Sequence, residues 1–115
     1  MSTLGTVAAH LSAFNARDAY AVVALFTDDA VFATADELVV GRRALSALFS
    51  QAFAEPVGAA LELRRAVVDG DTAACELVET LALPRGATAE LPVAAFYTVH
   101  SGALARVRVY RDTPA

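Results

Sequence analysis

The second half of the sequence predicts four consecutive β-strands joined by tight turns. Stretches of apolar and β-branched residues alternate with short segments of glycine, aspartate, proline and serine, which is the pattern of antiparallel hairpins. The expected strands cover residues 60–68, 72–83, 88–99 and 104–110, and the turns are Asp69-Gly70-Asp71, Pro84-Arg85-Gly86 and Ser101-Gly102. Strands connected in this way form a meander, because each turn places one strand beside the next.

The first half predicts helices instead. Apolar residues recur at helical spacing over residues 3–15 and 42–53, and Asp18 is positioned to cap a short helix between them. A short strand is expected at residues 30–34, with Asp36 and Glu37 in the loop beyond it, and Pro56-Val57-Gly58 ends the last helix. Helices followed by an antiparallel meander predict an α+β fold, with a cone-shaped curved sheet wrapped around the N-terminal helices in one domain spanning residues 1–115.

The chain is unusually apolar, so its fold must cover more hydrophobic side chains than usual. Hydrophobic residues make up 57% of the sequence and the mean hydropathy is +0.48. No run approaches ~18 uncharged apolar residues, so no membrane span is expected. The start of the chain also lacks the basic segment and apolar run of a signal peptide. We therefore expect a cytoplasmic protein whose surplus apolar residues line a pocket or fill a subunit interface.

Charge and cysteine content narrow the classes of partner. All nine basic residues are arginine, and thirteen acidic residues give a net charge of −4, so nucleic-acid binding is not expected. Cys75 is the only cysteine, and the two histidines, His10 and His100, are far apart, so the sequence shows no metal-ligand spacing. No glycine-rich phosphate loop is present either. We expect neither a metal nor a cofactor.

Several local motifs resemble the nuclear-transport-factor-2-like superfamily, which includes SnoaL-like, ketosteroid-isomerase-like and limonene-epoxide-hydrolase-like domains. Residues 13–18 and 23–32 are similar to its helix–helix–strand opening, and Gly41 precedes a third helix as in that superfamily. Residues 105–112 are similar to its last strand. The resemblance implies a conical pocket between the sheet and the helices, and a homodimer formed through the outer face of the sheet.

Neither catalytic set known from these relatives is complete in this sequence. The three ketosteroid isomerase positions correspond to His10, to Phe32 or Ala33, and to Ala94, so two of the three catalytic groups are missing. In the epoxide hydrolase pattern, Glu79 takes the place of one aspartate. Leu77 replaces the arginine and Val109 replaces the second aspartate.

One ionisable pair survives as a candidate for acid–base chemistry. If Glu79 faces inward beside Leu77, it is a carboxylate in an apolar cone, and a hydrogen bond to His10 would favour its ionised form. Such a pair is able to transfer a proton near neutral pH. The expected wall of the pocket consists of Phe14, Phe32, Phe49, Phe53, Leu77, Phe96, Val107 and Val109.

Two functions remain open from the sequence. The first is a cofactor-free enzyme that isomerises, cyclises or opens an epoxide in a small apolar metabolite. The second is a non-catalytic ligand-binding or accessory domain with a degenerate pocket. In either case, strand alternation places Tyr97, Arg106, Arg108, Tyr110 and Asp112 on the outer face of the sheet, where we expect a second subunit.

Overall fold

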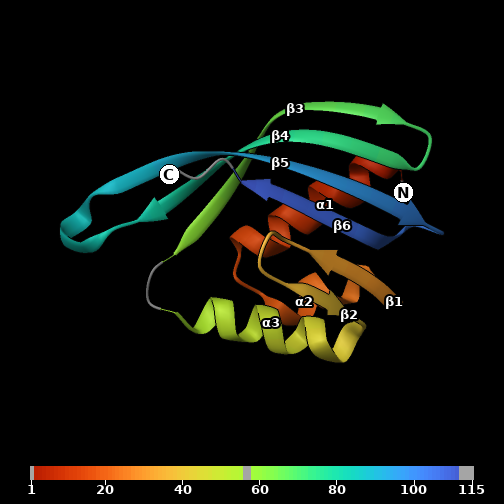
Figure 1. Cartoon of the computed structure of the whole chain (residues 1–115), viewed down its shortest axis with the longest axis horizontal. Coiled ribbons are helices and arrows are strands. Elements are labelled where there is room, and N and C mark those ends of the chain that lie inside the picture. The colour runs from red at the N-terminus through yellow and green to blue at the C-terminus, as the bar shows by residue number, and fades with distance from the viewer. Residues whose placement is uncertain (1, 56–57, 112–115) are drawn as a thin grey trace.

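The computed structural model describes residues 2–55 and 58–111, and its helices precede most of the sheet, as predicted (Figure 1). These helices are α1 (Thr3–Asn15), α2 (Ala19–Ala24) and α3 (Arg42–Ala54). Ser2 accepts a hydrogen bond from the backbone N–H of Gly5, and Asp18 accepts one from Ala21, so the first two helices have side-chain caps. No helix among the described residues is long and apolar enough to cross a membrane.

Six strands of the described residues form one mixed, curved sheet that does not close on itself. They are β1 (Phe26–Ala33), β2 (Leu38–Val40), β3 (Ala59–Asp69), β4 (Thr72–Ala82), β5 (Thr88–His100) and β6 (Ala103–Arg111). Their order is β2-β1-β6-β5-β4-β3, and only the β1–β6 pairing is parallel. The predicted meander is therefore β3 to β6, and the α+β fold class is confirmed.

The first strand is longer than predicted, and a second short strand pairs with it. Phe26 continues the apolar helical pattern that follows Asp18 in the sequence, but it begins β1 and lies opposite Leu104 of β6. The register shifts between Phe26 and Val31, so the acidic pair Asp28 and Asp29 falls in an irregular part of the strand. Tertiary pairing with β6 therefore overrides the helical pattern of the sequence at Phe26.

The core lies between the concave face of the sheet and the helices. Fully buried side chains come from α1, α2, α3 and the strands; the largest are Tyr97, Phe26, Leu45, Leu104, Val7, Val22 and Val107. Leu11 and Phe49 are buried, and Phe14, Phe32 and Leu48 pack against this core. The far ends of β4 and β5 project beyond the helical layer at the left of Figure 1. Pro56, Val57 and Asp112 lie outside the described residues.

The inward and outward faces of β5 are the reverse of those predicted. Tyr97 was expected on the outer face, but it is 2% exposed and belongs to the core. Phe96 was expected in the pocket, but it is 46% exposed and packs against Tyr110 on the outer face, with ring centroids 5.9 Å apart. Because Phe96 and Tyr97 are consecutive aromatic residues, the sequence alone allows either of them to face inward. The inner position goes to Tyr97 because its ring packs against His10, 5.8 Å away.

The end of α1 is fastened to the edge strand β3 by a side chain. The amide of Asn15 donates to the carbonyl of Leu61 and accepts from the backbone N–H of Leu61, both at 2.8 Å. Arg17 follows and donates to the carbonyls of Phe53 and Glu55 at the end of α3. These contacts fix the helices relative to the sheet at the side where the cavity lies.

Candidate active site

A small cavity of about 50 Å³ lies between the helices and the concave face of the sheet. Its lining consists of His10, Phe14, Phe32, Phe49, Leu61, Leu77, Val93, Ala95, Tyr97, Val107, Val109 and Arg111. Most of the predicted wall is therefore present around the cavity. Phe96 is absent because it faces outward, and Phe53 lies behind the lining, 5.3 Å from Phe14 and 5.9 Å from Phe49 between ring centroids.

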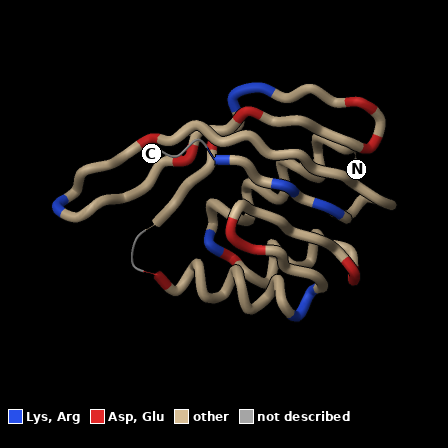
Figure 2. Tube along the Cα trace, viewed as in Figure 1, with Lys and Arg blue, Asp and Glu red and all other residues tan. Residues whose placement is uncertain are grey.

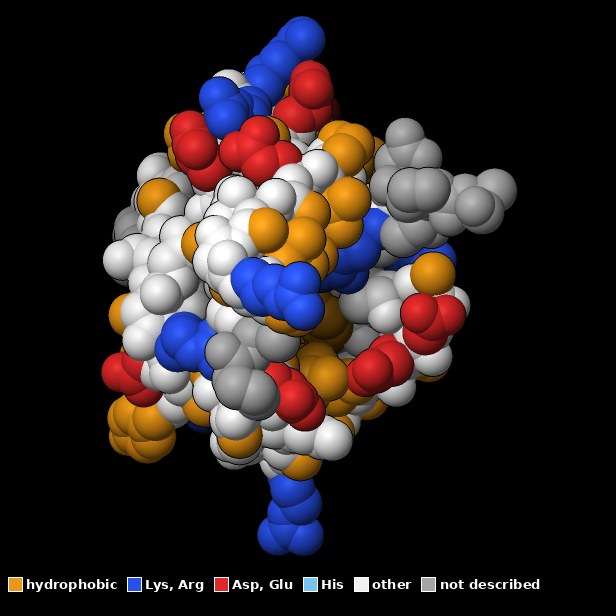
Figure 3. All heavy atoms as spheres, turned by 90° about the vertical axis from the view of Figure 1, so that its left-hand side faces the viewer, with side chains coloured by type: hydrophobic (Ala, Val, Ile, Leu, Met, Phe, Trp, Pro, Cys, Tyr) orange, Lys and Arg blue, Asp and Glu red, His pale blue; other side chains and the backbone are white. Residues whose placement is uncertain are grey.

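The mouth of this cavity is on the side of the molecule toward which β4 and β5 project. Figure 3 shows a hollow with hydrophobic side chains at its floor and both acidic and basic side chains around it. Basic residues recur along β6, where Figure 2 shows them as separate bands on the trace. The last of these, Arg111, lines the cavity, because it shares the inner face of β6 with Val107 and Val109.

His10 lies at the aromatic end of the cavity. Its ring makes edge contacts with Phe26, Phe49 and Tyr97, at centroid distances of 5.6, 6.4 and 5.8 Å. Burial in these surroundings lowers the pKa of His10 to about 4, because the charged imidazolium loses its hydration. The imidazole is therefore neutral at pH 7, and its Nδ1 has no hydrogen-bond partner among the described residues.

Glu79 lies behind the opposite end of the cavity, where it is paired with Arg111, the residue of this pair that lines the cavity. The guanidinium donates from Nε to Oε1 at 3.0 Å and from Nη2 to Oε2 at 3.1 Å, which is a bidentate ion pair. The side chain of Glu79 is 7% exposed and that of Arg111 is 39% exposed. Glu79 therefore faces inward, a direction that the sequence left open, and a buried carboxylate faces a partly solvated cation.

The structure does not bring Glu79 and His10 together in the expected hydrogen bond. The hydrogen bonds of the Glu79 carboxylate go to Arg111, while Nδ1 of His10 has no partner in the described part of the chain. The sheet register explains the separation. Arg111 lies opposite Val93 of β5, whereas His10 contacts Tyr97 of that strand. Four residues of a strand span roughly 13 Å.

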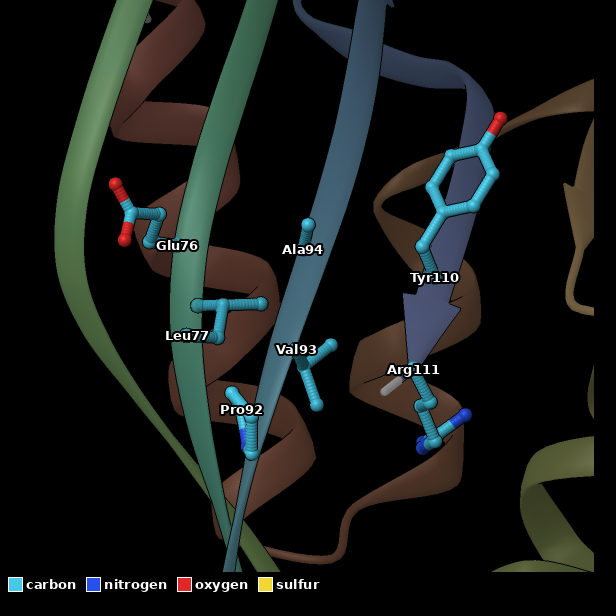
Figure 4. Close-up of a pocket in the computed structure, with 7 residues that line it drawn as sticks. All are labelled: Glu76, Leu77, Pro92, Val93, Ala94, Tyr110 and Arg111. Atoms are coloured by element: carbon cyan, nitrogen blue, oxygen red, sulfur yellow. The ribbon is translucent and has the colours of Figure 1, made fainter. Parts of the chain in front are cut away.

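Two further hollows adjoin the mouth. One has a volume of about 190 Å³ and shares Val109 and Arg111 with the cavity, and Thr34, Ala35 and Asp36 complete its lining. The other is an open groove of about 450 Å³ over the middle of β4 and β5 and the end of β6. Figure 4 shows Arg111 at the end of β6, near Val93 and Leu77, with Glu76 directed away from them. Arg111 thus borders all three spaces.

Two other titratable groups lie in or near the core. Burial raises the pKa of Tyr97 above its usual range, with a smaller effect from Cys75, so its hydroxyl stays protonated and remains a donor. Burial also raises the pKa of the Cys75 thiol, which therefore stays unreactive. Residues 2–55 and 58–111 contain no cluster of three side chains suited to hold a metal ion.

Arg111 and Tyr97 are cavity residues that the sequence did not predict, although strand alternation on β6 points to Arg111. Val107 and Val109 were assigned to the inner face, and continuing that alternation by two residues reaches Arg111. The expected strand ended at residue 110, one residue too early. The inward direction of Tyr97 depends on its contact with His10 of α1, which the sequence of β5 alone does not show.

Comparison with solved structures shows the class of fold to which this arrangement belongs. A limonene-epoxide-hydrolase-like epoxide hydrolase of Mycobacterium tuberculosis is 23% identical, with a TM-score of 0.83 over 96% of this chain and 82% of that one. SalBIII, an epoxide hydrolase/cyclase-like enzyme with a role in pyran ring formation in salinomycin, is 20% identical, with a TM-score of 0.82 over 96% of this chain and 91% of that one. A cystatin-fold protein of Novosphingobium aromaticivorans is 25% identical, with a TM-score of 0.80 over 95% of this chain and 97% of that one.

The sequence profile of the SnoaL-like domain matches residues 7–107. The chain therefore belongs to the SnoaL-like domain family, within the superfamily that its motifs resemble. The comparison with curated proteins found no match.

Proposed function

We propose that this protein is a cofactor-free enzyme that performs acid–base chemistry on a small apolar metabolite, with Glu79 as the proton-transfer group. The observation that carries the proposal is the buried carboxylate of Glu79, paired with Arg111 beside an apolar cavity. A buried ionisable group is costly unless it is paired or has a task. The epoxide hydrolase and the cyclase-like enzyme that share this fold support the same kind of chemistry.

In the proposed reaction, Glu79 removes a proton from a carbon next to a carbonyl group. The electron pair of the broken C–H bond moves toward the carbonyl oxygen and forms an enolate, and the proton is then returned to the same or another carbon. Arg111 uses two of its five N–H donors on Glu79, so others are left to stabilise the developing oxyanion. His10 contributes a neutral hydrogen-bonding group at the inner end rather than a direct partner for Glu79.

Substrate entry requires the cavity to widen. A cavity of about 50 Å³ is far smaller than the roughly 300–1,000 Å³ of typical ligand pockets. Phe14 and Phe32 are only partly buried at its boundary, so their side chains are the ones that can move without disturbing the fully buried core. Binding of a substrate is therefore coupled to repacking of this aromatic boundary.

Exchange of carbon-bound hydrogen with solvent tests the proposal without knowledge of the natural substrate. Small ketones are incubated with the protein in D₂O, and deuterium incorporation next to the carbonyl is followed by ¹H NMR. We expect Glu79→Gln to lower the exchange rate by ~10²–10⁴-fold, the usual contribution of a general base. Glu76→Gln on the outer face of the same strand is the matched control and keeps the rate. Equal rates for wild type and Glu79→Gln would remove Glu79 from the chemistry.

The second candidate function is a non-catalytic ligand-binding domain. It is favoured by the engagement of both carboxylate oxygens of Glu79 by Arg111, as in an ion pair with a purely structural role. In that case the same ketones bind in the cavity, and the exchange rate equals that of buffer alone.

We also propose that two copies of the chain associate through the outer sheet face in the cytoplasm. Phe96 and Tyr110 expose large aromatic surfaces there, and Arg106 and Arg108 complete a hollow of about 330 Å³ with them. An exposed aromatic patch of this kind is typical of an interface. Tyr97, initially assigned to this face, has no part in it.

A further inference from the structure

Two neutral polar groups lie at the inner end of the cavity. His10 lies on α1 and Tyr97 on β5; both line the cavity, and their rings are 5.8 Å apart. Among the described residues that line the cavity, the charged one is Arg111, which lies opposite Val93, and its partner Glu79 lies opposite Leu91, farther still from Tyr97 along β5. The inner end is therefore polar without being charged.

The imidazole of His10 has an unmet hydrogen-bonding capacity. A neutral imidazole carries one N–H donor and one acceptor nitrogen, and Nδ1 is buried with no partner among the described residues. Buried polar atoms without a partner are uncommon because each costs free energy, so such an atom in a cavity wall indicates a bound group that completes it. The neighbouring phenol of Tyr97 is held in its protonated, donating form.

The surroundings determine which ligand group fits. Phe26 and Phe49 enclose His10 with apolar ring edges, so an ion placed here would lose its hydration without gaining a counter-charge. A carbonyl or hydroxyl oxygen satisfies the imidazole and the phenol without that cost.

We propose that His10 and Tyr97 form a binding subsite for an uncharged oxygen at the inner end of the substrate. The inference rests on the proposed function and specifies its substrate class. The recognised oxygen and the carbon that exchanges its proton are different groups of the substrate, because Glu79 lies near the opposite end of the cavity. The substrate is thus an apolar molecule with two functional groups, and the end carrying an uncharged oxygen enters first.

Binding of phenol, toluene and benzoate tests the subsite. Phenol and toluene have nearly the same shape and differ in one hydroxyl group, while benzoate adds a charge. We expect phenol to bind the wild-type protein roughly 5–10-fold more tightly than toluene, as one net hydrogen bond allows, and benzoate to bind more weakly than either. Dissociation constants come from NMR titration.

Substitutions test whether the preference for phenol over toluene depends on His10 and Tyr97. Tyr97→Phe and His10→Phe each reduce the preference for phenol over toluene, whereas Tyr20→Phe and His100→Phe, the matched controls at exposed positions, leave it unchanged. If a core variant does not fold, the ring ¹⁵N shifts of His10 in the wild-type protein decide, since they move with phenol and not with toluene. Equal affinities for phenol and toluene, or ring nitrogens of His10 that do not respond to phenol, overturn the proposal.

The proposal of the subsite and the proposal of the reaction can be refuted independently of each other. Glu79→Gln retains the preference for phenol if the subsite exists, whether or not this variant loses the exchange reaction. Loss of exchange without any preference for phenol refutes the subsite alone.

Discussion

The ion pair between Glu79 and Arg111 predicts a measurable coupling between the two positions. Replacing Arg111 by Met keeps most of the apolar stem but leaves a carboxylate that is 7% exposed without its two charged donors. Hydrogen bonds to charged groups contribute about 1.5–3 kcal/mol each. Arg111 is 39% exposed, so water competes for it, and we expect a coupling of about 1–3 kcal/mol for the pair rather than the sum of both bonds.

The assay is a double-mutant cycle measured by urea unfolding at pH 7. The variants are Glu79→Gln, Arg111→Met and the double variant, and the coupling is the amount by which the double variant loses less stability than the two single variants together. The surface pair Arg65–Glu76 on the neighbouring strands is the control. Its atoms are 3.7 Å apart and its side chains are 72% and 68% exposed, so its coupling stays below about 1 kcal/mol. Additive effects at Glu79 and Arg111 within about 0.3–0.5 kcal/mol would refute the reasoning.

Two further predictions concern pH and assembly. Burial lowers the pKa of His10 from 6.5 to about 4, so the unfolded chain binds more protons in this window and the free energy of unfolding decreases as the pH falls from 6.5 to 4, by up to about 3 kcal/mol from this group. His10→Phe removes this slope in urea unfolding and His100→Phe retains it; an unchanged slope in His10→Phe contradicts the assignment. For assembly, light scattering is expected to give twice the chain mass of 12.0 kDa, and Phe96→Asp to give the monomer mass. A wild-type monomer at micromolar concentration would argue against the dimer.

The sequence was informative wherever local periodicity and turn chemistry agreed. The strands β3 to β6 were predicted to within one residue at each end, because glycine-containing turns separate them. Helices α1 and α3 were placed with similar accuracy by their apolar stripes. Glu79 alternates with Leu77 on β4 and faces inward with it, but the sequence alone left this direction open.

The features that the sequence did not predict depend on contacts between segments far apart in the chain. Phe26 satisfies a helical pattern equally well, and only its pairing with Leu104 makes it part of β1. The choice between Phe96 and Tyr97 for the inner face depends on His10, which lies on a helix almost ninety residues earlier. The partner of Glu79 was likewise unpredictable from spacing alone, because Arg111 reaches it across the intervening strand β5.

The contact between Asn15 and β3 has a consequence for the behaviour of the chain in concentrated solution. Strand β3 is an edge of the sheet, and an exposed edge is a template on which another chain can add a strand. At Leu61, the side chain of Asn15 already occupies both the backbone N–H and the carbonyl. A foreign strand must therefore displace two hydrogen bonds of 2.8 Å before it can pair through this position, so α1 also protects the edge against aggregation.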